Sequence, residues 1–565
     1  MHTNTFSNLA RHLVPSVPRP DWWRGSVLLI TLILALPVLV IFSFIFTPSG
    51  EVWRHLADTV LASYVTNSLL LVVGVAIGTL LIGVSTAWVV TATVFPGRRI
   101  FEWALLLPMA MPAYIIAYTY TGMLDFAGPL QSTLREWFDW GYGDYWFPDI
   151  RSLWGAMLML TLVLYPYVYL LARAAFLEQS VYVLDVGRSL GFGPWRVLFR
   201  IALPLARPAI ITGLSLALME TLADFGTVQY FGIDTFTTGI YRTWLGLGDS
   251  AAAAQLSAML LIFVFTLVVV ERWSRRQAQY HNSSRSFKPV PPIRLTRARA
   301  TVAFLVCLFP LLLGFILPAL QLLSWSIDTA ADVVDASFFG LILNSLSLAM
   351  GASVIALTIA LLMAYAKRLR GNALLNIAVR IAAMGYAIPG TVLAVGVMIP
   401  FAWIDNSIDG WMREQFDVST GLILSGTVVA LLFAYTVRFL SVSVQTVEAG
   451  LGKIRLSMDD AGRSLGYTPG RVLRDIHLPI MRTSLLTALL MVFVDVLKEL
   501  PATLMLRPFN FNTLAVRAYE LAGDERLADA ASAALSIVLV GIIPVILLSR
   551  SISRKRPGEE YVAQA

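Results

Sequence analysis

Long apolar runs recur along the whole chain, and they constrain its fold more than any other feature. The first run, Ser26 to Phe46, contains no charged residue, and about 20 apolar residues are enough for a helix to cross a bilayer. Hydrophobic residues make up 57% of the 565 positions and charged residues 14%, against about 25% charged in soluble domains. The sequence predicts an all-α polytopic membrane protein and argues against a disordered chain or an ordinary soluble enzyme.

About twelve runs are predicted to form transmembrane helices. The expected limits are 26–47, 64–93, 100–123, 152–176, 207–232, 251–271, 301–326, 341–366, 374–402, 421–446, 483–506 and 531–549. If the N-terminus is cytoplasmic, only eight of the 42 lysines and arginines fall in outward-facing segments, and cytoplasmic loops carry the excess of basic residues. Both termini are therefore predicted to be cytoplasmic, with the first run an uncleaved span.

A hydrophilic stretch rich in arginine, serine and proline divides the chain into two halves of six spans. The predicted parts are an N-terminal cytoplasmic tail (1–25), a first six-helix domain (26–271), a basic cytoplasmic linker (272–300), a second six-helix domain (301–549) and a C-terminal cytoplasmic tail (550–565). The linker is expected to lie near anionic lipid headgroups. The net charge of +7 is assigned to membrane topology and not to nucleic-acid binding, because the arginines border apolar segments.

The two halves are internal copies. Asn67-Ser68-Leu69 recurs as Asn344-Ser345-Leu346, 277 residues later, and Pro112 matches Pro389 at the same offset. The segment 185–204 matches 460–479 at an offset of 275, with thirteen of twenty positions identical. An even number of spans in each copy predicts parallel repeats, related by a pseudo-two-fold axis along the membrane normal. Two such bundles leave a pathway at their interface, which is the plan of a transporter.

The strongest repeat lies in a predicted cytoplasmic loop of each half. An aspartate opens each copy, where a carboxylate favours a helix N-terminus, and Gly191 and Gly466 interrupt the helical pattern. Pro194 and Pro469 suit the first turn of a second helix. A loop with its own short helices, present twice, is a suitable docking surface for a partner.

This loop resembles the hallmark of permease subunits of binding-protein-dependent ABC importers: Glu-Ala-Ala, three residues, Gly, nine residues, Ile-x-Leu-Pro. Both copies depart from Glu-Ala-Ala, with Asp first and Gly third, while the spacing, the Gly and the Ile-x-Leu-Pro positions match. The residues that carry the resemblance are Asp185, Gly187, Gly191, Ile201, Leu203 and Pro204 in the first copy and Asp460, Gly462, Gly466, Ile476, Leu478 and Pro479 in the second.

The resemblance implies the permease fold of an ABC importer in a bacterial inner membrane. Each loop would insert into a cleft of one subunit of an ATPase homodimer, and a substrate-binding protein would deliver cargo on the outer side. No G-x-x-x-x-G-K-[ST] phosphate loop occurs in the sequence, so ATP and Mg would be used by that separate subunit. The chain itself is predicted to be no enzyme and to bind no cofactor.

Among importer permeases the chain looks most like the double-length ferric-iron permeases, through the segments 220–249 and 498–531. The alternatives are the same class of permease with thiamine, phosphonate or polyamine as cargo. An ion-coupled secondary transporter belongs to another class, and the duplicated docking loop argues against it. The five scattered histidines predict no metal site, and the residues predict no catalytic site.

Four carboxylates fall in predicted spans near the two-fold interface: Glu220, Asp224, Asp495 and Glu499. The first two match the last two at an offset of 275. Within each half the two carboxylates are spaced i, i+4, which predicts that both lie on one helix face. Acidic residues in a span are costly and face a cavity or a partner. Two interpretations stay open: a gate for a cation, or a structural role in which Lys498 neutralises Asp495.

Arg242 and Arg517 coincide at the same offset and fall in predicted external loops. They are candidates for docking the binding protein, and loop capping is the alternative. The single cysteine, Cys307, lies in an apolar run and is assigned to helix packing.

Overall fold

The computed structural model describes residues 22–48, 50–141, 143–178, 194–276 and 293–553. Within these residues eleven helices are long and apolar enough to cross a membrane, or up to twelve if one bent pair counts as a single span. Only two short strands accompany them, β1 (Thr93–Val94) and β2 (Ile293–Arg294), which pair in parallel. The predicted all-α polytopic fold is confirmed.

The helices of the first half are α1 (Trp22–Ser43), η1 (Phe44–Phe46), α2 (Gly50–Thr59), α3 (Leu61–Ala92), α4 (Arg98–Ala104), η2 (Leu107–Ala110), α5 (Ala113–Leu124), α6 (Pro129–Phe138), α7 (Leu153–Glu178), α9 (Pro194–Val197), η3 (Leu198–Ala202), α10 (Leu203–Ala223), α11 (Gly226–Tyr230), α12 (Phe236–Tyr241), η4 (Arg242–Gly246) and α13 (Ser250–Arg276). Those of the second half are α14 (Arg297–Leu311), η5 (Leu312–Ile316), α15 (Leu317–Val333), α16 (Ala336–Arg370), α17 (Ala373–Ala382), η6 (Gly385–Ala387), α18 (Gly390–Phe416), α19 (Val428–Leu451), α20 (Leu456–Ser464), α21 (Pro469–Val472), η7 (Leu473–His477), α22 (Leu478–Leu497), α23 (Pro501–Leu506), α24 (Leu514–Gly523) and α25 (Leu527–Ser553).

A bundle of three long helices forms the core of each half: α3, α7 and α10 in the first, and α16, α19 and α22 in the second. Small residues allow close packing in the first bundle. A Cβ atom on Gly78 would lie 2.6 Å from the side chain of Thr161, and one on Gly74 would lie 2.4 Å from the sulfur of Met157. These glycines let α3 approach α7 closely, as small residues do at helix interfaces in membranes.

The repeated Asn-Ser pair makes equivalent hydrogen bonds in both halves. The Asn67 side chain donates a hydrogen bond to a backbone carbonyl before α12, and Asn344 donates to one before α24. The hydroxyls of Ser68 and Ser345 accept from backbone N–H groups at the starts of the same two helices. Because these helices lack internal partners for their first N–H groups, the pair fixes where each one begins.

Two predicted spans are interrupted at a proline. The run 100–123 bends by 91° between Arg98–Ala110 and Ala113–Phe138, and the run 374–402 is interrupted between η6 and α18. Pro112 and Pro389 stand at the two breaks, each in an extended conformation. A proline has no N–H to donate and disfavours helical backbone at the preceding residue. The prediction of continuous spans at these two places is therefore wrong.

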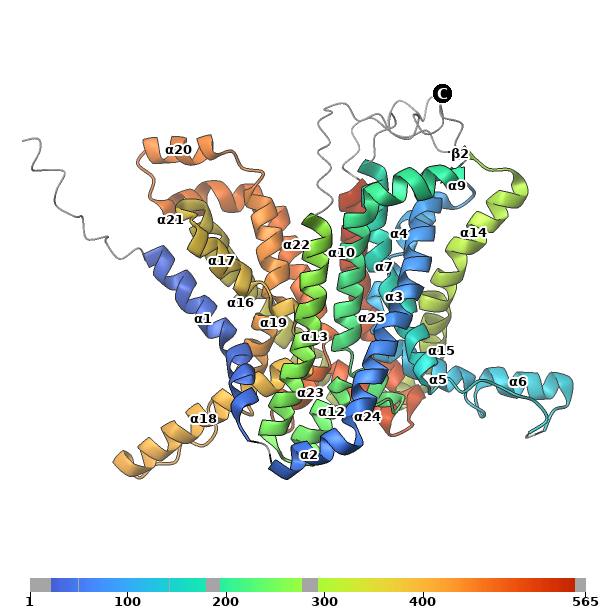
Figure 1. The fold of residues 1–565 in the computed structure, drawn as a ribbon, viewed down its shortest axis with the longest axis horizontal. Helices are drawn as coiled ribbons and strands as arrows, with labels where there is room; N and C mark the ends of the chain where they lie inside the picture. The colour runs from blue at the N-terminus through green and yellow to red at the C-terminus, as the bar shows by residue number, and fades with distance from the viewer. Residues whose placement is uncertain (1–21, 49, 142, 179–193, 277–292, 554–565) are drawn as a thin grey trace, which may run out of the picture.

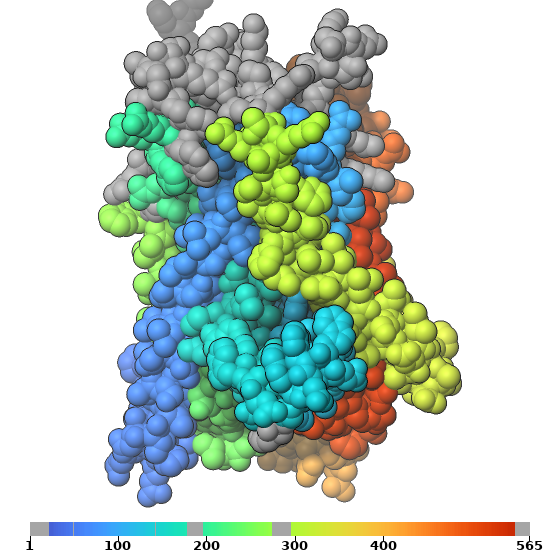
Figure 2. All heavy atoms as spheres, turned by 90° about the vertical axis from the view of Figure 1, so that its right-hand side faces the viewer, coloured from blue at the N-terminus to red at the C-terminus, as the bar shows by residue number. Residues whose placement is uncertain are grey.

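The first helix of each half packs against the other half. In α1 the carbonyl of Pro37 would lie 2.7 Å from a Cβ atom on Gly396 of α18, and α1 also contacts α17. In the reverse direction, η5 accepts a hydrogen bond at Leu313 from the Tyr120 hydroxyl of α5. Figure 1 shows α1 beside α16 and α17, and Figure 2 shows the yellow-green α14 and α15 lying across the blue first half.

The loops gather at two opposite ends of the bundle. The helices α9, α20 and α21 lie at one end, and α2, α6, α12 and α24 lie at the other (Figure 1). The described parts of the two loops, α9 in the first copy and α20 and α21 in the second, therefore lie at the end opposite Arg242 and Arg517.

Candidate functional site

The second copy of the repeated loop forms the predicted helix, turn and helix, as α20, α21 and η7. Asp460 lies on α20 with 71% of its side chain exposed, and it pairs with Arg463 one turn later at 3.1 Å. The carboxylate that opens the motif is thus available to a partner. In the first copy, Asp185, Gly187 and Gly191 lie outside the described residues.

Two glycines shape this loop. Gly466 follows α20 with a φ of +78°, a left-handed conformation that favours glycine at the end of a helix. Gly462 lies where α20 crosses the next segment, because a Cβ atom there would be 3.1 Å from side-chain atoms of both Ile476 and Val472. The glycine spacing of the motif therefore sets the turn and lets α20 pack on α21 and η7.

The Ile-x-Leu-Pro positions join the loop to a long helix in both halves. They are Ile201, Leu203 and Pro204 in the first copy and Ile476, Leu478 and Pro479 in the second. Each proline occupies the first turn of a long helix, where its missing N–H is tolerated. A π-helix precedes each one, closed by a hydrogen bond from Leu203 to Leu198 and from Leu478 to Leu473. In this wider turn, the carbonyls of Leu198 and Leu473 accept a hydrogen bond from the residue that directly precedes each proline.

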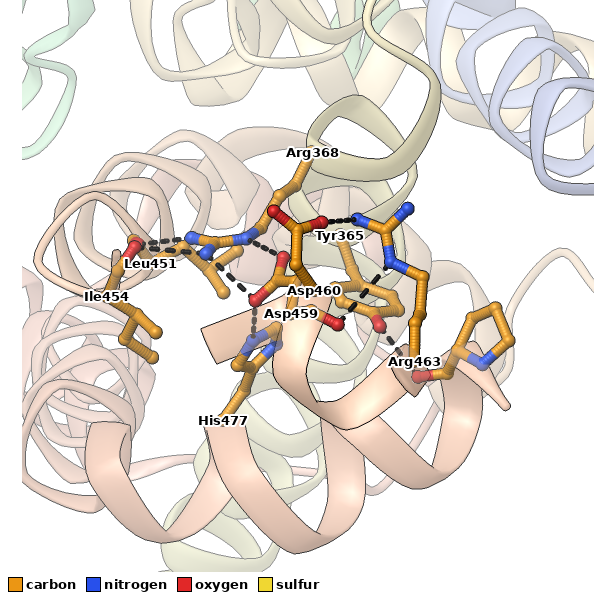
Figure 3. A network of polar contacts seen from close by, with 9 residues as sticks. Tyr365, Arg368, Leu451, Ile454, Asp459, Asp460, Arg463 and His477 are labelled. Atoms are coloured by element: carbon orange, nitrogen blue, oxygen red, sulfur yellow. Dashed lines mark hydrogen bonds and ion pairs between the residues drawn. The ribbon is translucent and has the colours of Figure 1, made fainter. Parts of the chain in front are cut away.

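A buried polar network lies beneath α20 (Figure 3). Asp459 accepts hydrogen bonds from the Arg368 guanidinium at 2.8 Å and 3.1 Å, and its Oδ1 lies 2.7 Å from Nε2 of His477. Its side chain is 5% exposed and that of His477 is 0% exposed. Burial alone raises the pKa of the Asp459 carboxyl, but the hydrogen bonds from Arg368 and His477 outweigh it and hold this pKa below its ordinary value.

A cavity of about 120 Å³ lies between the two halves, and all four candidate gate residues line it. Glu220 and Asp224 come from the first half, and Asp495 and Glu499 from the second. Tyrosines from both halves line it too, as do two basic residues of the second half. These further residues are Tyr114, Tyr167, Tyr386, Arg438 and Lys498.

The prediction that each carboxylate pair shares one helix face is wrong. α10 ends at Ala223 and α22 at Leu497, so Asp224 and Glu499 lie beyond the helices that carry their partners. Asp224 and Glu499 lie where the predicted spans are interrupted, and each precedes a short helix, α11 and α23 respectively. Asp224 accepts hydrogen bonds from the Thr227 hydroxyl at 3.0 Å and from the N–H of Val228 at 3.1 Å.

Glu499 likewise bonds to the start of a short helix, and it also forms an ion pair. It accepts from the N–H groups of Ala502 and Thr503 at 2.9 Å and 3.0 Å, and from Arg438 at 3.1 Å. Glu499 is 5% exposed and Arg438 is 7% exposed. The Glu499 carboxylate therefore forms a buried ion pair with Arg438 and accepts hydrogen bonds from the N–H groups at the start of α23.

Glu220 and Asp495 are the carboxylates that stay on the long helices. Lys498 pairs with Asp495 at 2.8 Å, which is the neutralisation considered as the alternative to a gate. The position matching Lys498 at the offset of 275 is Ala223. Glu220 thus has no lysine of its own at the equivalent spacing, and the two halves give the cavity unequal charge.

The candidate docking arginines lie at the opposite end from the repeated loops. Arg242 begins η4 and forms an ion pair with Asp234, in which both side chains are partly exposed. Arg517 lies on α24 and is half-buried. Their placement is compatible with docking, and the ion pair of Arg242 is also compatible with loop capping.

Sequence reasoning missed Arg438, Asp459 and His477 as members of these sites. Arg438 lies in an apolar run without a charged neighbour, so no local pattern pairs it with Glu499. Asp459 and His477 do not stand out in a comparison of the two copies, because the matching positions of the first half are Leu184 and Ala202. A search for shared residues keeps what the copies have in common and discards such differences. Within the described residues, no group of three or more His, Cys, Asp or Glu side chains could hold a metal ion.

Comparison with known proteins defines the class. The family described as the binding-protein-dependent transport system inner membrane component matches residues 79–279 and again 356–556. The chain belongs to this family and contains two copies of its domain. It is therefore a multi-pass transport subunit that lacks the ATPase domain, and membership implies a binding protein and an ATPase as partners.

Two ferric permeases align with nearly the whole chain, and a molybdenum permease with about a third of it. It is 26% identical to the Fe(3+)-transport system permease protein FbpB 2 of Haemophilus influenzae over 546 residues, which cover 94% of this chain and 99% of that one. It is 24% identical to the ferric transport system permease protein FbpB of Actinobacillus pleuropneumoniae, over 92% of this chain and 76% of that one. The molybdenum transport system permease protein ModB of Escherichia coli is 26% identical over 34% of this chain.

Proposed function

We propose that the chain is the permease subunit of an ATP-driven importer for ferric iron in a bacterial inner membrane. The observation that carries this proposal is the similarity to ferric permeases along nearly the whole chain. An ATPase homodimer would bind the two repeated loops on the cytoplasmic side and use ATP and Mg. A binding protein would deliver iron at the other end, near Arg242 and Arg517.

The charge of the central cavity supports a cationic cargo. Four carboxylates line it against Arg438 and Lys498, so the balance is negative. A cavity lined by one sign of charge concentrates ions of the opposite sign. Phosphonate is thereby disfavoured as an alternative cargo, while thiamine and polyamines are cations and must be separated from iron by experiment.

In the proposed transport cycle the two halves would move relative to each other, and their carboxylates would have different roles. The six-helix units 26–271 and 301–549 would rock against each other about the cavity, joined by the linker 272–300. The carboxylates Glu220 and Asp495 would face the passing cation, and Asp224 and Glu499 would hold the broken ends of the two spans beside it.

The test is uptake of radiolabelled ferric iron by iron-starved cells with and without this gene, each with and without ATP depletion. Uptake that requires both the gene and ATP is expected. Glu220→Gln, at unchanged protein amount, should reduce that uptake. Gene-independent uptake would refute the iron assignment, and competition by unlabelled thiamine, phosphonate or polyamine would then identify the cargo. An ATPase that fails to copurify with the chain would refute the importer class for it.

A further inference from the structure

The network at Asp459 fastens α20 of the second repeated loop to two other segments of the second half. Asp459 lies on α20, Arg368 near the end of α16, and His477 at the end of η7, directly before α22. One buried carboxylate therefore joins α20 to α16 and to the start of α22 through hydrogen bonds of 2.7–3.1 Å.

Further bonds of the same residues complete the attachment. Arg368 also donates to the carbonyl of Leu451, the last residue of α19, at 2.6 Å and to that of Ile454, shortly after this helix, at 2.9 Å. The Tyr365 hydroxyl donates to the carbonyl of Pro469 at 2.6 Å, at the start of α21. Figure 3 shows the side chains of Arg368 and His477 pointing toward Asp459. Both ends of the loop are thus tied to α16, the longest helix of the second half.

The matching positions of the first half carry side chains that cannot build this network. Leu184 replaces Asp459, Ala202 replaces His477, and Thr91 replaces Arg368. The Thr91 hydroxyl bonds within its own helix, to the carbonyl of Ala87 at 2.7 Å. Ala202 is fully buried, and a methyl group offers no hydrogen bond.

The aromatic position next to the network differs in the same way. Tyr365 contacts the ring of His477 edge to face at 5.5 Å, whereas its match, Trp88, contacts Phe176 at 5.4 Å. The buried ion pair of this region in the first half, Arg173 with Glu102 at 3.1 Å, joins α7 to α4. Neither of these contacts involves a hydrogen bond to the repeated loop.

We propose that Asp459 is a positioning residue that makes the second loop the stiff connection between the ATPase and the bundle. On the proposed function, a partner that pulls on α20 moves α16 and α22 with it, because a buried charge cannot be separated from its partners without a large cost. The first loop has Leu184, Ala202 and Thr91 at the matching positions, so it cannot be joined to its bundle by the same charged groups. The second loop therefore has a charged connection that the shared motif does not itself require.

The experiment reports whether nucleotide on the ATPase changes the central cavity. Ala223→Cys places a reporter thiol in the wall of the cavity, while the native Cys307 is fully buried and reacts little. The complete complex with its ATPase is reconstituted, and the rate of reaction with a membrane-impermeant maleimide is compared without nucleotide and after trapping with ATP and vanadate. Asp459→Ala is compared with the matched first-loop variant Leu184→Ala, and Asp459→Glu serves as the conservative variant.

We expect nucleotide trapping to change the reporter rate by about tenfold in the parent and in Leu184→Ala, within the usual range of coupling between sites. In Asp459→Ala the change should fall to less than about twofold while ATP is still hydrolysed, and Asp459→Glu should restore part of it. A role confined to folding would lower the amount of complex without separating hydrolysis from the cavity response.

A full reporter response in Asp459→Ala, or an equal loss in Leu184→Ala, would overturn the inference. If Asp459→Ala does not accumulate, Arg368→Gln removes the same tie from the other side, and an unchanged response there would also overturn it. An ATPase that does not copurify with the unaltered chain is a different result, because it refutes the proposed function and the inference falls with it.

Discussion

The two halves of the molecule share their backbone design and differ in how they use charge. Both break the third predicted span at a proline, hold a short helix with an Asn-Ser pair, and have an acidic residue shortly after the end of a long helix beside the cavity. In the described structure, however, the basic residues that line the cavity, Arg438 and Lys498, both belong to the second half. The comparison teaches that a duplicated chain keeps features that fix the path of the backbone, while side-chain pairs diverge between the copies.

The largest expected effect distinguishes Glu499 from its match, Asp224. Glu499→Ala should lower the free energy of unfolding by about 3–5 kcal/mol, because it leaves the buried Arg438 without its counter-charge. Asp224→Ala removes hydrogen bonds at the start of a helix but leaves no buried charge without its partner, so it should lower the free energy of unfolding by about 1–2 kcal/mol. Thermal unfolding of the detergent-purified variants measures both.

A double variant sharpens this prediction. Combining Arg438→Met with Glu499→Gln removes both charges together, so most of the stability lost in Glu499→Ala should return. Equal instability of the single and double variants would show that the contribution of Glu499 lies in its bonds to α23 and not in the ion pair.

The network under α20 gives the next effect and a pH dependence. The charged and titratable groups that face Asp459 are Arg368 of α16 and His477 of η7, with Tyr365 beside them. Because the pKa of Asp459 is lowered in the folded state, the contribution of its carboxylate to stability is complete above about pH 4 and is lost as the pH falls through the lowered folded value.

Asp459→Asn should therefore cost about 1–3 kcal/mol at neutral pH through unsatisfied buried partners. The difference from the parent chain should shrink in acid below about pH 4, as followed by thermal unfolding at a series of pH values. The matched first-half variant Leu184→Asn lacks the arginine and should show no such pH dependence. A difference for Asp459→Asn that stays constant into acid would contradict the ionised network.

A smaller effect is expected from exchanging the cavity residues that differ between the halves. Ala223→Lys places a cation three residues after Glu220, as Lys498 follows Asp495, and should lower the initial rate of ferric uptake about tenfold by weakening the negative potential of the cavity. Lys498→Ala should not lower that rate. Ala223→Met is the control for side-chain size, and an equal loss in Ala223→Met would assign the effect to bulk.

The smallest effects belong to the outer arginines. Arg242→Ala removes a partly exposed ion pair and should change the free energy of unfolding by less than about 1 kcal/mol. If Arg242 and Arg517 bind the substrate-binding protein, each alanine variant should raise the concentration of loaded binding protein needed for half-maximal uptake by about threefold. Unchanged concentration dependence in both variants would favour loop capping.

The sequence was sufficient to predict the helical class, the duplicated halves and the motif of the second loop, because apolar run lengths and repeated residues are local signals. It was not sufficient for the breaks after Ala110 and Ala223, since the apolar runs continue across them and only tertiary contacts satisfy the exposed backbone. The partner of Glu499 was equally hidden, because Arg438 lies 61 residues earlier on another helix. Differences between copies, such as Asp459 against Leu184, carry information that a search for repeats discards.

The exchange of first helices between the halves imposes an order on biosynthesis. α1 is made first, yet the residues of α17 that cover it begin only at residue 373. At about 5–20 residues per second of translation, α1 is in the membrane for tens of seconds before its neighbour α17 emerges. α14 meets the opposite situation, since α3, α4 and α5 already lie in the membrane when it is inserted. The first helix to be made thus completes its packing only after α16, α17 and α18 of the second half have been made.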